Sequence, residues 1–210
     1  MQVQYRFPEE LALFPSRAFY EGRLRTELRD SAAVLAVLKL SAFPWPVEGD
    51  VVKPVVFLDC ASEEDMGGSS KGNEGQAALA ARVVELLSTP RSEDARAAFD
   101  ARPLGITALT PYAKQAKALK AAIPARFGVA CATIDSFQGR ESDVVLFSTV
   151  RANATGDLGF VDDARRLNVA WTRAKLTLVL IGSKATMATN ALWRDAIASC
   201  TEVRLPEAAA

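Results

Sequence analysis

Short apolar runs alternate along this chain with longer amphipathic stretches, and this alternation limits the folds that it can adopt. The runs, rich in Val, Ile and Leu, fall at residues 34–40, 55–59, 106–110, 129–134, 144–150 and 176–182. Helical patterns fall at residues 9–20, 74–87, 112–123, 164–172 and 187–199. Strands that are apolar throughout and alternate with helices form parallel sheets covered on both faces. The sequence therefore predicts an α/β fold with a doubly wound, mainly parallel sheet and helices on both faces.

The length of the chain fits one domain. Its 210 residues, 50% of them hydrophobic, are enough to bury one sizeable core. We expect this domain to span residues 1–204, with an N-terminal motif and helical arm over 1–30 and a surface loop over 88–103. A second solvated loop is predicted at 63–75, which is rich in Gly, Ser and charge. Residues 205–210 are expected to form a frayed tail.

Composition excludes several kinds of chemistry. The chain has no His, which excludes Ser-His-Asp and Cys-His catalysis as well as His-ligated metals. Its three Cys are far apart in the sequence, so we expect no metal site. The N-terminus does not resemble a signal peptide and no apolar run has the length of a membrane span, so we expect a protein of the cytoplasm or nucleus. Its 25 basic and 25 acidic residues cancel, so any contact with nucleic acid must be local.

Polar segments follow several of the predicted strands. In a doubly wound sheet, ligands bind beyond the carboxyl ends of the strands. The segments 110–112, 135–141 and 151–153 each come after such a strand. We therefore expect these three segments to contribute to one site.

Two long motifs resemble a known family. They are Thr-Ile-Asp-Ser-Phe-Gln-Gly-Arg-Glu at 133–141, continuing to Val-Arg at 150–151, and Arg-Arg-Leu-Asn-Val-Ala-Trp-Thr-Arg-Ala-Lys at 165–175. The block from 132 to 182 resembles the Upf-type and senataxin-type helicases of superfamily 1, and Gln-Tyr-Arg at 4–6 extends the match toward the N-terminus. This resemblance implies a RecA-like fold of the P-loop NTPase type, and identifies the chain with the second, C-terminal motor domain of an ATP-dependent helicase.

The resemblance also implies how the chain takes part in binding ATP with Mg²⁺. It places Arg6 and Arg173 at the terminal phosphate as catalytic residues, and a planar guanidinium suits the negative charge that builds there. Arg173 stands at the end of a predicted helix that leads into a strand. Four further residues are implied to bind the nucleotide: Tyr5 at the base, Glu141 at the ribose, and Gln138 and Gly139 as sensors.

A second group of residues is implied to hold the backbone of single-stranded RNA or DNA. A strand end followed by Thr-Pro offers a hydroxyl group and a helix N-terminus, both of which bind phosphates. Thr110 can equally act only as the N-cap of a helix that begins at Pro111, and the two roles are compatible. The residues predicted to contact nucleic acid are Thr110, Pro111, Tyr112, Thr133, Ser136, Arg151 and Asn153.

Two motifs needed for ATP hydrolysis do not occur in the sequence: Gly-x-x-x-x-Gly-Lys-Ser/Thr, which cradles the phosphates, and an Asp-Glu pair, which holds Mg²⁺. One hypothesis is that a first RecA-like domain, in the same chain or a separate one, supplies them, and that this chain alone is inactive. The other is a stand-alone, non-catalytic module that binds nucleic acid or another helicase. The joint presence of Arg6, Glu141 and Arg173 favours the first. RNA is favoured over DNA as the substrate, but backbone contacts leave both open.

Overall fold

The computed structural model describes residues 2–28, 31–65 and 67–206, and its centre is a six-stranded sheet. The strand order is β10-β5-β9-β8-β6-β7, and every neighbouring pair is parallel. The strands are β5 (Val55–Asp59), β6 (Ile106–Thr110), β7 (Ala130–Thr133), β8 (Ser142–Ser148), β9 (Ala174–Gly182) and β10 (Thr201–Glu202). The predicted α/β class with a parallel sheet is therefore confirmed.

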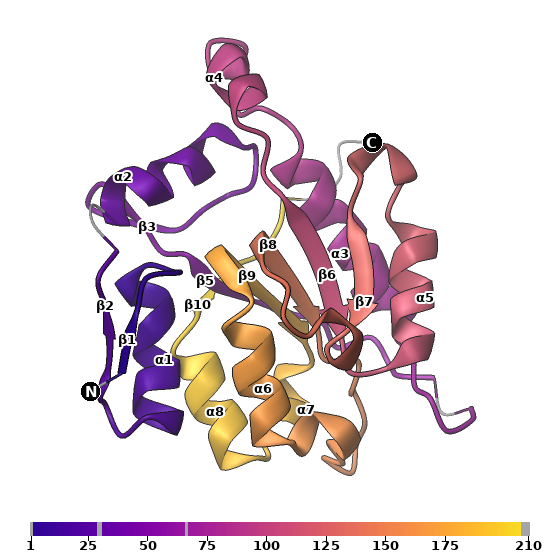
Figure 1. Ribbon diagram of the computed structural model, residues 1–210. Coiled ribbons are helices and arrows are strands. Elements are labelled where there is room, and N and C mark those ends of the chain that lie inside the picture. The colour runs from indigo at the N-terminus through magenta and orange to yellow at the C-terminus, as the bar shows by residue number, and fades with distance from the viewer. Residues whose placement is uncertain (1, 29–30, 66, 207–210) are drawn as a thin grey trace.

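Helices cover both faces of this sheet (Figure 1). On one face lie α1 (Glu9–Phe19), α6 (Ala164–Trp171) and α8 (Ala191–Ala198), and on the other lie α3 (Glu74–Leu87) and α5 (Ala113–Ala122). Successive residues of a strand point to opposite faces. In β5, accordingly, Phe57 packs into the core beneath α1 and α6, whereas Val56 and Leu58 pack into the core beneath α3. The sheet is doubly wound, as predicted.

The N-terminal arm packs against the first of these faces. Its strands β1 (Gln2–Gln4) and β2 (Leu24–Thr26) pair in parallel, apart from the main sheet, and α1 connects them. The ring centroids of Phe14 and Trp171 lie 4.3 Å apart, and the Trp171 indole N–H donates to the Leu11 carbonyl at 3.0 Å. These contacts fix the arm to α6.

One predicted strand is wrong. Residues 34–40 belong to α2 (Ser31–Ala36) and a 3₁₀ helix, η1 (Val37–Leu40). Leu35 and Leu38 are fully buried whereas Ala36 is exposed, so the apolar residues follow a helical spacing of three. A short run of Val and Leu fits a buried helix as well as a strand, and its sequence pattern alone does not distinguish them.

The other differences concern loops and helix ends. The helix predicted at 187–199 begins later, as α8, because the side chain of Asn190 caps it by accepting from Trp193 N. A separate short helix, α7 (Lys184–Met187), precedes it. The surface loop at 88–103 includes the exposed helix α4 (Arg96–Ala101). The remaining short elements are β3 (Val47–Glu48), β4 (Val51–Val52) and 3₁₀ helices η2 (Ala125–Phe127), η3 (Asp135–Phe137) and η4 (Gly159–Asp162). Of the predicted frayed tail, residues 207–210 lie outside the described residues.

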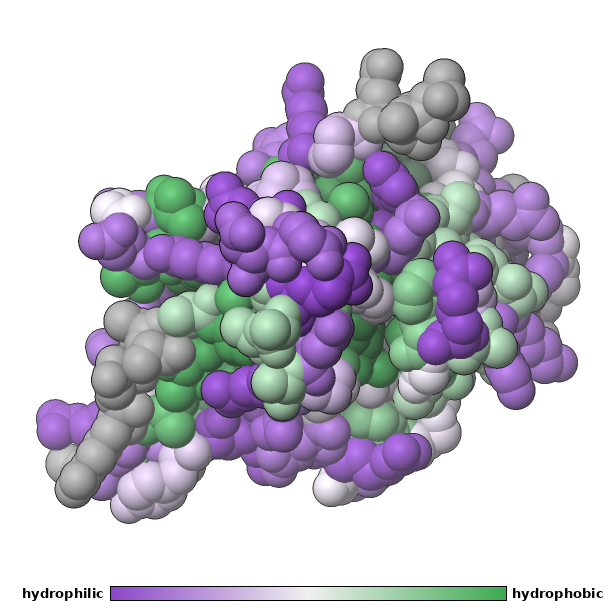
Figure 2. All heavy atoms as spheres, turned by 90° about the horizontal axis from the view of Figure 1, so that it is seen from above, coloured by the Kyte–Doolittle hydropathy of each residue, from purple (hydrophilic) through white to green (hydrophobic). Residues whose placement is uncertain are grey.

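The surface of the domain is mixed in character. Seen from the side on which α4 lies, hydrophilic side chains predominate and hydrophobic ones show between them (Figure 2). Within the described part of the chain, no helix has both the length and the apolar character that a membrane span needs.

Candidate functional site

Two of the predicted ATP-binding residues lie at the amino ends of neighbouring strands. Glu141 directly precedes β8 and Arg173 directly precedes β9, and these strands begin their pairing at Ser142 and Ala174. The Ser142 N–H donates to the Arg173 carbonyl at 3.1 Å. Glu141 therefore lies at the opposite end of the sheet from the residues that follow the strands, because the chain must run back along the sheet between the parallel strands β7 and β8. The expectation that segment 135–141 shares one site with 110–112 and 151–153 is wrong for Glu141.

The arm brings Arg6 to the same place. Nη2 of Arg6 lies 2.8 Å from Oε1 of Glu141, and its Nη1 donates to the Thr172 carbonyl at 2.9 Å. The side chains of Arg6 and Glu141 keep 34% and 36% of their surface exposed. Residues from three distant segments thus meet at one partly open position.

Arg173 completes this cluster from the turn between α6 and β9, rather than from the helix itself. Its Nε donates to the Val169 carbonyl at 3.1 Å, which fixes the base of the guanidinium. Partial burial and the neighbouring positive charge of Arg6 lower the pKa of Arg173, against the opposing effect of Glu141. Two guanidinium groups accompany one carboxylate, so the cluster formed by Arg6, Glu141 and Arg173 carries a net positive charge. This donor set suits the phosphates of a nucleotide.

Gln4 holds the loop that carries Arg6, a role that sequence reasoning missed. Its Oε1 accepts hydrogen bonds from the backbone N–H groups of Arg6 at 2.7 Å and Phe7 at 3.0 Å, and its Nε2 donates to the Phe7 carbonyl at 2.7 Å. Nε2 also bonds the Thr26 hydroxyl on β2. Between these anchored positions, Tyr5 is 67% exposed. The loop therefore presents a tyrosine ring to solvent beside the charged cluster.

Gln138 and Gly139 precede Glu141 in an exposed turn. Gly139 has φ of +79°, a conformation that glycine adopts without strain. Arg140 links this turn to the cluster, because its carbonyl accepts from Nη1 of Arg173 at 3.4 Å. The structure thus places the turn next to Arg173.

The predicted nucleic-acid residues gather at the other end of the sheet. Thr110 ends β6 and Thr133 ends β7, and the two residues are register partners. The Thr133 hydroxyl donates to Oγ of Ser136 at 2.9 Å, and Ser136 is exposed. Thr110 itself is fully buried, and its hydroxyl accepts from Tyr112 N at 3.4 Å. This end offers hydroxyl groups and backbone, with Ser136 the most accessible of these side chains.

Helix α5 begins later than predicted. Its first residue is Ala113 and Tyr112 is its N-cap, so Pro111 is not the first helical residue and Thr110 does not cap the helix. The backbone N–H of Lys114 in the first turn instead donates to the Ser70 hydroxyl at 3.0 Å. The Tyr112 side chain is buried, and its hydroxyl accepts from Phe160 N at 3.2 Å. Tyr112 thus faces the interior.

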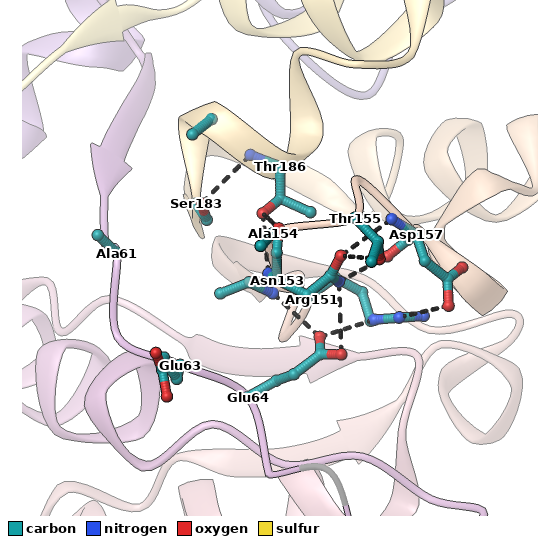
Figure 3. Close-up of a pocket in the computed structure, with 12 residues that line it drawn as sticks. Ala61, Glu63, Glu64, Arg151, Asn153, Ala154, Thr155, Asp157, Ser183 and Thr186 are labelled. Atoms are coloured by element: carbon teal, nitrogen blue, oxygen red, sulfur yellow. Dashed lines mark hydrogen bonds and ion pairs between the residues drawn. The ribbon is translucent and has the colours of Figure 1, made fainter.

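Arg151 lies at the end of β8 as expected, but its guanidinium points inward. Nε lies 2.7 Å from Glu64 Oε2 and Nη2 lies 2.8 Å from Asp157 Oδ2, and Figure 3 shows the two carboxylates around it. Burial lowers the pKa of Arg151, but hydrogen bonds to Glu64, Asp157 and Tyr112 outweigh burial and raise it. Asn153 donates from Nδ2 to the Asp157 carbonyl at 2.8 Å. The side chains of Arg151 and Asn153 thus take part in the hydrogen-bond network that organises this loop.

The prediction of a solvated loop at residues 63–75 is wrong for Glu64. That segment was expected to be solvated, yet Glu64 is 5% exposed because Oε2 also accepts from Ala152 N at 3.0 Å. The sequence showed only a charged, glycine-containing stretch, and no local pattern marks one acid of such a stretch as buried. A cavity of about 500 Å³ lies beside this network, between the segments that follow β5, β8 and β9 (Figure 3).

The turn before Arg151 is strained. Val150 has φ of +72°, which is rare for a β-branched residue, and Arg151 N donates to the Thr149 carbonyl at 2.8 Å. Two buried side chains hold this turn: Asn73 Nδ2 donates to the Val150 carbonyl at 3.0 Å, and Gln76 Oε1 accepts from Val150 N at 2.8 Å. Asn73 is also the predicted N-cap of α3, since its side chain accepts from Gln76 N. The side chain of Asn73 therefore fixes both the start of α3 and the turn that follows β8.

Comparisons with known proteins identify a family for this chain. The model of a family described as "AAA domain" matches residues 1–185. The chain is 34% identical over 215 residues to Regulator of nonsense transcripts 1 of Dictyostelium discoideum. This match covers 94% of this chain and 14% of that protein. It is 36% identical over 203 residues to the Drosophila melanogaster homologue, covering 92% and 16% of the two chains. It is 33% identical over 201 residues to the ATP-dependent helicase NAM7 of Saccharomyces cerevisiae, covering 92% and 19%.

The chain thus spans less than a fifth of the length of these three relatives. Among solved structures, the C-terminal domain of a possible DNA helicase from Lactobacillus plantarum is similar with a TM-score of 0.48 and 15% identity, over 95% of this chain and 98% of that one. The family match extends over most of the described sheet, and the expected α/β fold of RecA-like type is confirmed. The chain belongs to the AAA domain family, and over most of its length it resembles the Upf-type helicases of superfamily 1.

Proposed function

We propose that this chain is the second, C-terminal RecA-like domain of an ATP-dependent RNA or DNA helicase, spanning residues 1–204, and that it completes an ATP site shared with a first RecA-like domain. The observation that carries the proposal is the convergence of Arg6, Glu141 and Arg173 at the amino ends of β8 and β9. A structural ion pair needs one arginine. A second guanidinium held beside it, at a cost in burial and repulsion, is expected where a polyanion binds.

In this site each residue of the cluster has a separate task. Arg6 and Arg173 stabilise the negative charge that develops on the transferring phosphoryl group, and act as catalytic residues. Glu141 accepts from the ribose hydroxyl, and its ion pair with Arg6 fixes the guanidinium before the nucleotide arrives. Mg²⁺ neutralises phosphate charge when bound. Its ligands come from the first domain, and the described residues offer no group of three or more acidic or Cys side chains that could hold a metal ion.

Tyr5, Gln138 and Gly139 complete the nucleotide-binding surface. The exposed ring of Tyr5 stacks on the base, which every nucleotide offers as a flat apolar face. The turn with Gln138 and Gly139 leads directly to Arg140, whose carbonyl bonds Arg173. A change at this turn on nucleotide binding therefore reaches the catalytic arginine through one hydrogen bond.

The opposite end of the sheet holds the single-stranded nucleic acid in this proposal. Thr133 and Ser136 bind phosphates through hydroxyl groups, and the segment of Thr110, Pro111 and Tyr112 does so through its backbone. Arg151 and Asn153 act here as positioning residues, because their side chains face the internal network. Strands β8 and β9 begin at the proposed ATP cluster and end at the nucleic-acid end. They therefore form a rigid connection that couples ATP binding at one end to movement of the single-stranded nucleic acid at the other.

RNA is the favoured substrate. Two of the compared relatives carry names that refer to nonsense transcripts, which are RNA. A role in RNA processing in the cytoplasm or nucleus follows for this protein. Contacts made through phosphates would also accept DNA.

The stand-alone binding module is the second candidate, and the absence of both phosphate-cradling and metal-holding motifs from the sequence favours it. An immunoblot of native extract with an antibody to residues 135–175 separates the two. A band much larger than 22.5 kDa supports a helicase that carries both RecA-like domains in one chain. A band at 22.5 kDa whose protein gains no ATP hydrolysis from any co-purifying partner would favour the binding module.

A further inference from the structure

Phe160 is an aromatic side chain that the fold holds out toward solvent. It lies in η4, after β8, and 54% of its surface is exposed. Tyr5 and Phe160 are the only aromatic residues of the exposed class in the part of the chain that the structure describes. Tyr5 belongs to the proposed nucleotide site. Phe160 belongs neither to that site nor to the residues predicted to contact nucleic acid.

The backbone around Phe160 is fixed, so its exposure is not that of a loose loop. Phe160 N donates to the Tyr112 hydroxyl at 3.2 Å, and Gly159 N donates to Oδ1 of Asp157 at 3.0 Å. Asp157 in turn bonds the buried guanidinium of Arg151. Gly159 has φ of +51°, and a Cβ there would clash with the Arg151 guanidinium, so only glycine fits. A buried ion-paired network thus positions a ring that it does not bury.

Phe160 also lies where three strand-end segments meet. Its ring centroid is 5.5 Å from that of Tyr112, which follows β6, at an interplanar angle of 32°. The guanidinium carbon of Arg166 lies 5.4 Å from the Phe160 ring centroid. Nη2 of Arg166 lies 3.4 Å from Oδ2 of Asp135, which follows β7, and its Nη1 lies 3.8 Å from Oδ2 of Asp163. An aromatic pair with a cation beside it therefore occupies the carboxyl end of the sheet.

We propose that Phe160 is a stacking platform for a nucleobase of a bound single strand, with the guanidinium of Arg166 beside its ring. Proteins that hold single strands combine aromatic rings for the bases with cations for the backbone, and such stacking tolerates any sequence because every base has a flat face. The proposal rests on the proposed function, which assigns this end of the sheet to nucleic acid. It adds base contacts to a site otherwise built from hydroxyl groups and backbone.

The test compares strands with and without bases. The affinity of the 210-residue chain is measured by fluorescence anisotropy for a labelled homopolymer and for an abasic strand of the same length, in RNA and DNA forms. Phe160→Ala is expected to weaken binding of the base-bearing strand by about 5- to 100-fold, with less than a twofold change for the abasic strand. Phe160→Trp is expected to keep the affinity. Leu13→Ala, which removes another exposed apolar side chain, on α1, is the matched control. It is expected to change the affinity for neither the base-bearing nor the abasic strand.

Equal losses on both strands, or no loss on either, would overturn the stacking role while leaving the proposed function standing. Loss on the base-bearing strand in Phe160→Trp equal to that in Phe160→Ala would also overturn it, since an aromatic ring would then not suffice. A failure of the unaltered chain to bind either strand would count against both the stacking role and the nucleic-acid part of the proposed function. The unaltered protein thus distinguishes the two failures.

Discussion

Nη2 of Arg6 lies 2.8 Å from Oε1 of Glu141, and this ion pair joins the N-terminal arm to the amino end of β8. Arg6 also bonds the carbonyl of Thr172, next to Arg173. The arm is therefore part of the charged cluster and not an appendage. Three family motifs that are widely separated in the sequence become one site through this contact.

Tyr5→Ala should raise the KM for ATP about 10-fold in the protein that carries both RecA-like domains, with little change in kcat. The ring is exposed and stacks on the base in the proposed site, and base stacking on an aromatic side chain contributes about 1–3 kcal/mol. Tyr5→Phe retains the ring and should behave as the unaltered protein. Steady-state ATP hydrolysis measures both constants, and an unchanged KM in Tyr5→Ala would remove the base-stacking role.

Gln4→Ala should weaken ATP binding, since three hydrogen bonds of this side chain hold the backbone of Arg6 and Phe7. A hydrogen bond of this kind contributes about 1 kcal/mol, so a loss of roughly 10-fold or more is expected. Gln4→Glu keeps the acceptor toward Arg6 and Phe7 but loses the donor to the Phe7 carbonyl. Its affinity for ATP should lie between those of the unaltered protein and Gln4→Ala. Titration with a fluorescent ATP analogue checks the order, and equal affinities for all three proteins would contradict the role.

Glu64→Ala should lower the free energy of unfolding by about 3–5 kcal/mol, because it leaves Arg151 buried without its closest partner. Glu93→Ala breaks the exposed pair with Arg96 and should cost at most about 1 kcal/mol. Urea unfolding of the two variants measures the difference. Similar small losses in both would show that Glu64 does not compensate the Arg151 charge.

The network also predicts a pH dependence. Hydrogen bonds from Arg151 and from the Gly159 backbone lower the pKa of Asp157 below its unfolded value of about 3.9. The resulting stabilisation is fully present above the unfolded pKa and is lost as pH falls through the folded one. Asp157→Asn should therefore have a lower Tm than the unaltered chain at pH 7, and the difference should shrink as the pH approaches 3. A difference that is constant with pH would contradict the assignment.

Much of the fold could be predicted from the sequence because the strands are apolar throughout and the helices between them are periodic. Val55–Asp59 and Ile106–Thr110 have the predicted bounds, and so does the helix Glu74–Leu87, whose N-cap Asn73 was visible as a residue type. The failure at 34–40 arose where a short apolar run fits either structure. Local pattern could not settle it, because the burial of Leu35 and Leu38 depends on tertiary packing.

The site could be predicted only as a set of residue types. The motifs pointed to Arg6, Glu141 and Arg173, but their contact depends on how the arm folds back and on the return of the chain between β7 and β8. The inward turn of Arg151 could not be foreseen, because its partner Glu64 belongs to a loop of unremarkable composition. Long-range ion pairs of this kind leave no periodic trace in a sequence.

The measurement that tests the central claim most directly is ATP hydrolysis by the polypeptide in which this domain is joined to a first RecA-like domain, with and without Arg173→Ala. The control is Arg96→Ala, which removes an exposed arginine from α4, outside the cluster. Arg173→Ala should lower kcat by about 1,000-fold or more and leave the binding of single strands within a few fold, and the control should keep its turnover unchanged. Full turnover by Arg173→Ala would contradict the account.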